Sequence, residues 1–186
     1  MNSIIEQLEE QSKSLGEINF EADNFICRDW NVYYNLHNPE NFEDPEDSPE
    51  WYVASEVYKY YETPLKTTDK LNFYSSEKVE NFKSITDLIN KWADIEKMLL
   101  DAIVHYTFGN GGAYASAKYY VYAKKTMEIL HETKFSNEEF IKRNLRIKTI
   151  EFGEEDDEIA LIFDCSWDEE HGLIIRLKNN ELIAFE

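Results

Sequence analysis

Cysteine is scarce in this 186-residue sequence, which contains only Cys27 and Cys165. The sequence also lacks a run of 18 apolar residues and the apolar segment of a secretory signal. We therefore expect a cytoplasmic protein with two thiols and no membrane-spanning helix. A disulfide between the two cysteines is the alternative, which a reducing compartment disfavours.

Basic residues are also few, because 19 Lys and Arg stand against 38 Asp and Glu and give a formal net charge of −19. Such a chain repels nucleic-acid backbones and anionic membranes, so neither is an expected ligand. A basic protein or a cation is compatible with this charge, and so is a role in solubility alone. The 42% of hydrophobic and 15% of aromatic residues exclude intrinsic disorder, and the length suits one packed domain over residues 1–186.

The acidic residues are concentrated in two windows that contain no Lys or Arg. These windows, at 29–58 and 149–175, hold 18 of the 38 acidic residues. Basic residues gather instead between Lys118 and Lys148, so we expect an acidic surface with one basic helical region. If the two windows fold onto one surface, they form a single negative field that speeds association with a basic protein.

Hydrophobic spacing predicts that helices dominate the middle of the chain. From Ser84 to Gly109, apolar residues recur at three- and four-residue steps, and Ser84 is expected to cap this helix. Ser136 is expected to cap a short turn. The other segments predicted before residue 140 are a helix at 3–15 ended by Gly16, an extended stretch at 18–36, a loop at 37–49, a helix at 49–62 ended by Pro64, a loop or short strand at 65–76 and a helix at 114–132.

From Leu145 onward the period changes to that of strands. A phase slip after Ile147 predicts a β-bulge, and Asn179-Asn180 predicts a tight hairpin turn. The expected strands lie at 145–152, 159–167, 173–178 and 181–185. The sequence therefore predicts an α+β domain in which a C-terminal antiparallel meander, at about 145–186, packs against two or three helices from a helical middle at about 49–140. The N-terminal strands are expected to join this sheet or to form a small one of their own.

Nothing in the sequence supports a nucleophile with its base. In the strand at 159–167, Phe163, Cys165 and Trp167 are expected to face the core, because alternate residues of a strand point to the same side. The Cys165 thiol is therefore an unsuitable nucleophile, and no Gly-x-Ser-x-Gly motif occurs. The glycines at 109–112 are not followed by Gly-Lys-Ser/Thr, which excludes a phosphate-binding loop of that kind. An enzyme is therefore not the favoured interpretation.

The turn expected between the strands at 159–167 and 173–178 carries three carboxylates and an imidazole in four consecutive residues. Carboxylates suit hard divalent cations, and zinc or manganese also accepts histidine. One hypothesis is therefore a metal site formed by Asp164, Asp168, Glu170 and His171. The alternative is structural: Asp168 accepts hydrogen bonds from N–H groups of the turn, and Gly172 takes a positive φ.

The residues Trp167, Asp168, Glu170, His171 and Gly172, followed by Leu173, form a Trp-Asp-x-Glu-His-Gly sequence between two strand patterns. This run resembles the C-terminus of an uncharacterised family of bacterial proteins. The resemblance implies a bacterial domain of unknown function with a strand, a turn and a strand over about the last 45 residues. Proteins of this kind are similar to small acidic proteins found beside bacterial toxin systems, although no activity is established for the family.

Aromatic residues surround the acidic loop at 37–49, and more Tyr residues flank the helix predicted at 49–62 than one buried helix face requires. Tyr and Trp are favoured interface anchors, and acidic residues beside them attract a basic partner. We therefore expect Asp44, Asp47, Trp51 and Tyr52 to bind a partner.

Three functional hypotheses follow from these observations. The favoured one is a non-enzymatic, acidic bacterial protein that binds another protein, with an immunity-type inhibitor of a basic toxin as its specific form. The second is a divalent-metal-dependent enzyme built on Asp164, Asp168, Glu170 and His171. The third is a structural domain with no dedicated site. The favoured hypothesis requires no cofactor, whereas the second requires a divalent metal.

Overall fold

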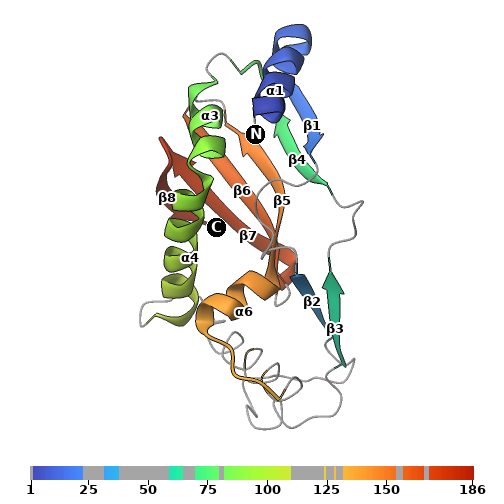
Figure 1. The fold of residues 1–186 in the computed structure, drawn as a ribbon, viewed down its shortest axis with the longest axis vertical. Helices are drawn as coiled ribbons and strands as arrows, with labels where there is room; N and C mark the ends of the chain where they lie inside the picture. Colours follow the sequence, from blue (N-terminus) through green and yellow to red (C-terminus); the bar gives the residue numbers. More distant parts are fainter. Residues whose placement is uncertain are drawn as a thin grey trace.

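The computed structural model of the chain combines a six-stranded sheet, a separate two-stranded sheet and helices (Figure 1). The structure describes residues 2–22, 32–37, 59–64, 70–79, 82–109, 124, 128, 132–153, 157–165 and 168–186. For residues 2, 32–37, 59–64 and 168–171 the description is confined to the backbone. All structural statements below refer to these residues.

The large sheet joins the N-terminal and C-terminal parts of the chain. In spatial order its strands are β1 (Ile18–Ala22), β4 (Leu71–Ser75), β5 (Leu145–Phe152), β6 (Glu158–Cys165), β7 (Asp168–Lys178) and β8 (Glu181–Phe185). Neighbouring strands are antiparallel except β4 and β5, which are parallel. The last four strands form the predicted meander, and the register shift between Ile147 and Thr149 is the predicted bulge in β5.

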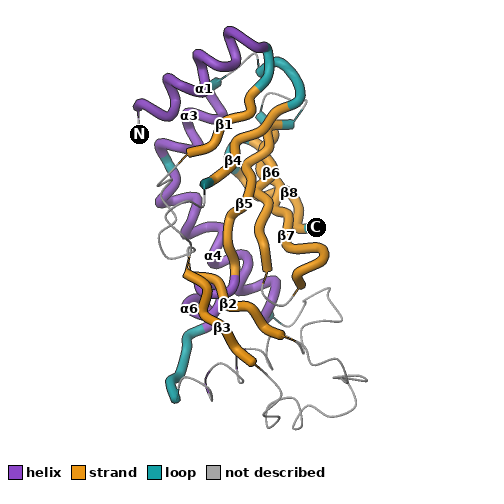
Figure 2. Tube along the Cα trace, turned by 90° about the vertical axis from the view of Figure 1, so that its right-hand side faces the viewer, coloured by secondary structure: helices purple, strands orange, loops and turns teal. Residues whose placement is uncertain are grey.

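The helices of the described part of the chain lie on one side of this sheet (Figure 2). They are α1 (Asn2–Leu15), α3 (Lys83–Asn90), α4 (Trp92–Phe108) and α6 (Asn137–Asn144). The predicted α+β class is therefore confirmed. None of these helices is long and apolar enough to cross a membrane.

The core lies between the helices and the covered face of the sheet. Phe163 and Cys165 of β6 are 1% exposed, as their alternation predicted, and Leu161 of the same strand is fully buried. Leu99 and Ile103 of α4 are fully buried too. Trp167, expected to be buried beside them, lies outside the described residues.

The N-terminal strands were expected either to join the large sheet or to form a small one of their own, and both arrangements occur. Strand β1 joins the large sheet, whereas β2 (Val32–His37) pairs with β3 (Lys59–Pro64) in the small sheet. The helix predicted at 49–62 is wrong over residues 59–62, which belong to β3. Tyr60, Tyr61 and Thr63 are residue types that favour strands, and pairing with β2 satisfies the backbone of β3. Residues 49–58 lie outside the described part of the chain.

The long helix predicted from Ser84 is divided into two. Helix α3 begins one residue before Ser84, which is buried in the first turn and does not act as the cap. Lys91 separates α3 from α4, with its own N–H donating to the carbonyl oxygen of Asp87. The division lets both the buried face of α3 and Trp92, which is 1% exposed, reach the core. Of the helix predicted at 114–132, only Lys124 and Glu128 are described as helical.

Ser136 caps a helix longer than the expected turn. Its hydroxyl accepts a hydrogen bond from the Glu139 N–H at 3.1 Å, while the Glu139 carboxylate accepts one from the Ser136 N–H at 2.8 Å. This reciprocal pair satisfies two N–H groups that the first turn of a helix leaves without partners. The hydrogen bond from the Ser136 N–H lowers the pKa of Glu139.

Replacing Ser136 with alanine is expected to lower the free energy of unfolding by about 1 kcal/mol. Because the pKa of Glu139 is lowered in the folded state, its contribution is present above the ordinary carboxyl pKa and disappears as pH falls through the lowered value. Urea unfolding at neutral and acidic pH measures both effects. The exposed Ser14 provides the control, and equal losses for Ser14→Ala and Ser136→Ala would contradict the capping role.

Candidate functional site

The polar cluster predicted as a turn is placed instead at the beginning of strand β7. Strand β6 ends at Cys165, and β7 starts at Asp168, which is opposite Cys165. The next aligned pair is Phe163 with Leu173, so Asp164 of β6 faces the four residues 169–172 of β7. The predicted turn at 168–172 is therefore wrong. The extra residues form an irregular bulge, and Phe163 and Leu173, the aligned pair beyond it, are both buried.

Gly172 gives this bulge its conformation. Its φ is +70°, as predicted, and a Cβ atom at this position would contact the carbonyl oxygen of Phe163. Residues with a side chain rarely adopt such a φ, and here the neighbouring backbone also leaves no room for one. The structural role that the sequence suggested for Gly172 is therefore confirmed by the backbone.

Asp164, the first member of the predicted metal site, is held by two basic side chains. Its Oδ2 atom lies 2.8 Å from an Nη atom of Arg146, and its Oδ1 atom lies 3.3 Å from the Nζ atom of Lys148. A divalent cation would compete with both for the same carboxylate. Within the described residues, no group of three or more His, Cys, Asp and Glu side chains is suitably placed for a metal ion.

The side chains of Asp168, Glu170 and His171 lie outside the description, so the structure does not test the hypothesis of a metal site at these residues. A bound metal would stabilise the protein by about 2.7 kcal/mol at 100 times its dissociation constant, which shifts the melting temperature by several degrees. Because Asp164 is already neutralised, we expect Mn²⁺, Zn²⁺ or Ca²⁺ to leave the melting temperature unchanged. Thermal unfolding with and without each metal tests this expectation. A rise that His171→Ala removes would contradict it.

The predicted partner-binding residues Asp44, Asp47, Trp51 and Tyr52 all lie outside the described part of the chain. Most of the acidic window at 29–58 lies there too, so its position relative to the second window stays a prediction.

The described acids of the second window are mostly paired with bases. Glu158 accepts a hydrogen bond of 3.2 Å from Arg176, and Asp157 lies 3.8 Å from the Nζ atom of Lys178. Arg176 also donates to both carboxylate oxygens of Glu186, at 2.8 and 3.2 Å, which lowers the pKa of Glu186 and raises that of Arg176. These pairs lie at the surface, so each contributes little to stability. They partly neutralise the described acids of this window.

The helical layer carries acids that have no such partners. On α1, Glu6 and Glu10 form no ion pair with a described residue, and the same holds for Asp94 and Asp101 on α4. Most described bases, in contrast, are within 4 Å of a carboxylate. The outer surface of these helices therefore also carries net negative charge. The sequence analysis considered only the two windows without bases and missed these residues. Glu6 and Glu10 are four residues apart and Asp94 and Asp101 are seven apart, a spacing that places each pair on one face of a helix.

A protein-family model described as a domain of unknown function (DUF6985) matches residues 40–185. Because the match covers most of the chain, the protein belongs to this family, and the expected membership of an uncharacterised family is confirmed. No curated protein and no solved structure matches the chain.

Proposed function

We propose that this member of a family of unknown function is a non-enzymatic module that binds a basic protein, and that it acts as an immunity-type inhibitor of a basic bacterial toxin. The observation that carries the proposal is the unequal pairing of charges. Most described bases are already engaged by a carboxylate, whereas Glu6, Glu10, Asp94 and Asp101 form no ion pair with a described residue. Together with the net charge of −19, these unpaired surface acids produce a negative field that attracts a basic partner.

The proposed mechanism has two stages. The negative field first attracts the basic partner over several ångströms and raises the association rate, since unpaired charges at a surface steer encounters more than they add to affinity. Aromatic anchors then hold the complex after water has left the contact. We assign this second stage to Trp51 and Tyr52, with Asp44 and Asp47 beside them, because Trp and Tyr dominate the energetics of protein interfaces. An acidic surface of this kind disfavours nucleic acid and anionic membranes as ligands.

Co-expression with the basic proteins encoded next to this one tests the proposal. Each neighbour is expressed alone and together with this chain, and growth is measured. We expect one basic neighbour to arrest growth alone, and this chain to restore growth by forming a complex with it. If no basic neighbour forms a complex and none is toxic, the proposed function fails.

A pair of double variants separates local recognition from net charge. Asp44→Lys with Asp47→Lys and Glu6→Lys with Glu10→Lys change the formal charge equally. The first is expected to slow association about tenfold more than the second, because it reverses charges beside the aromatic anchors. Equal effects would remove Asp44 and Asp47 from the interface.

A further inference from the structure

The two outer strands of the large sheet differ in how their free edges are treated. On β1, the Gln11 side chain from α1 accepts a hydrogen bond from the Asn19 N–H at 3.0 Å and donates one to the Asn19 carbonyl oxygen at 2.9 Å. Its amide thus occupies the position that a further strand would take. Strand β8 pairs with β7 along one edge. Along its other, outer edge, no described residue makes contacts of this kind and no described strand pairs. An exposed edge of this kind is a template for another strand.

The backbone of β8 presents hydrogen-bonding groups at this edge. Ile174 and Glu186 exchange both of their backbone hydrogen bonds, each 2.9 Å long. In an antiparallel pair, hydrogen-bonded and non-hydrogen-bonded positions alternate. Phe185, aligned with Ile175, is therefore in a non-hydrogen-bonded position, and its N–H and C=O point away from β7.

An apolar side chain lies on the same strand. Ile183 falls at the register shift between β7 and β8 and is 51% exposed. Isoleucine favours strands and would contribute apolar contact to a strand added at this edge. The sheet edge therefore offers both backbone groups and an apolar contact.

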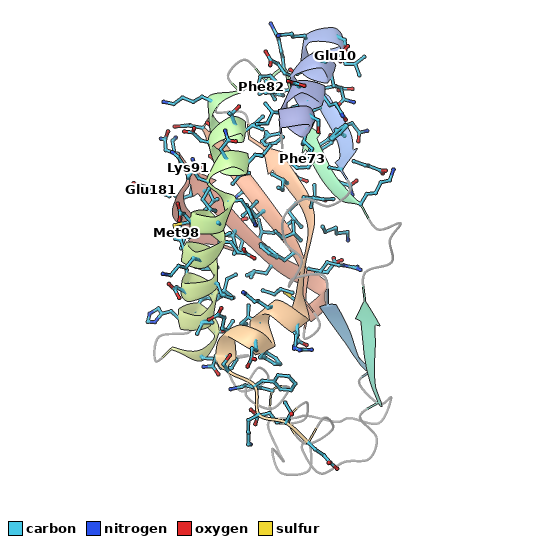
Figure 3. All side chains as sticks on the ribbon, viewed as in Figure 1. Glu10, Phe73, Phe82, Lys91, Met98 and Glu181 are labelled. Carbon is cyan, nitrogen blue, oxygen red and sulfur yellow. The ribbon has the colours of Figure 1, made fainter. Side chains whose placement is uncertain are left out.

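Acidic side chains without an ion pair to a described residue lie on β8 and on the helix that packs against it. The ring of Tyr106 on α4 stacks on that of Phe185, with 4.4 Å between their centroids, which places α4 over β8 (Figures 1 and 3). Asp94, Met98 and Asp101 recur at steps of four and three and so share one stripe of α4. Figure 3 shows Met98 on the same side of the molecule as Glu181 of β8. Asp94, Asp101 and Glu181 form no ion pair with a described residue.

We propose that the outer edge of β8 receives an extended, basic segment of the partner as an additional antiparallel strand. Backbone hydrogen bonds to Phe185 would supply affinity, and contact with Ile183 together with attraction to Asp94, Asp101 and Glu181 would select an alternating apolar and basic sequence. This inference rests on the proposed function and specifies how the basic partner is recognised.

The probe is an extended peptide of alternating lysine and valine, about six residues long as strands usually are. A second peptide of the same sequence carries N-methyl groups on alternate residues, which removes backbone donors but keeps every charge. Calorimetry is expected to show about tenfold weaker binding of the methylated peptide, the size expected for losing one or two net hydrogen bonds. Hydrogen exchange at the Phe185 amide is expected to slow with the unmethylated peptide.

Matched variants locate the binding. Ile183→Lys is expected to weaken the unmethylated peptide about tenfold, whereas Leu15→Lys, which makes the same change at a 65% exposed residue of α1, is expected to leave it unchanged. Equal binding of the two peptides, or unchanged exchange at Phe185, would overturn the edge proposal and leave field-driven binding of a basic protein intact. A dimer of this chain that Ile183→Lys dissociates would also overturn it, because the edge would then be occupied by a second copy.

Discussion

Replacing Gly172 with alanine is expected to lower the free energy of unfolding by about 3 kcal/mol or more. The residue has a φ of +70°, and an added Cβ would contact the carbonyl oxygen of Phe163, which belongs to a rigid central strand. The bulge would have to unwind or β6 and β7 would have to separate. Equilibrium denaturation with urea measures the loss, and a normal near-ultraviolet dichroism spectrum shows that the variant still folds.

Gly16 is the matched control for this prediction. Its φ is +80°, but an added Cβ would have no heavy atom within 4 Å. Gly16→Ala therefore carries only the conformational cost, about 1–2 kcal/mol. The difference between the two variants isolates the contact with Phe163. Glu169→Ala should cost less than Gly172→Ala, and losses of the same size at Gly16 and Gly172 would contradict the account of the bulge.

Truncating Phe163 to alanine is expected to lower the free energy of unfolding by about 3–5 kcal/mol. The side chain is 1% exposed and lies near the C-terminal end of β6, between Ile147 of β5 and Leu173 of β7. Removal of the ring leaves a cavity, which could close only if β5, β6 and β7 moved together. The same urea experiment measures the loss.

The control for Phe163 is Ile183→Ala, which shortens an exposed residue of the same sheet and should change stability by no more than about 0.5 kcal/mol. A small loss at Phe163 would mean that the meander and the helical layer do not share one core.

The C-terminal half of the fold could be predicted because its local signals agree with one another. Strand alternation, the bulge after Ile147 and the turn at Asn179-Asn180, whose φ values are +53° and +64°, all specify the same meander. The capping signal at Ser136 was correct for the same reason. Where local and tertiary signals disagreed, prediction failed: residues 59–64 follow a helical start signal but pair with β2. The parallel pairing of β4 with β5 joins segments too distant in sequence for a local pattern to reveal.

The candidate site was less predictable than the fold. Consecutive polar residues at 168–171 resembled a turn, because sequence alone does not show that Asp164 faces four residues of β7. Nor does it show that Arg146 and Lys148, 16 to 18 residues away, occupy the Asp164 carboxylate. The edge of β8 is open because β8 comes last in the order of strands in the sheet. Composition and charge do not reveal that order.

Electrostatic attraction of a basic protein partner is the central claim, and the ionic-strength dependence of the association rate tests it most directly. Stopped-flow mixing of this chain with its basic partner gives the rate at low and high salt. Because added salt screens the field of a chain with a net charge of −19, we expect the association rate to fall by about tenfold or more while the dissociation rate changes little. An association rate that is indifferent to salt would contradict the claim.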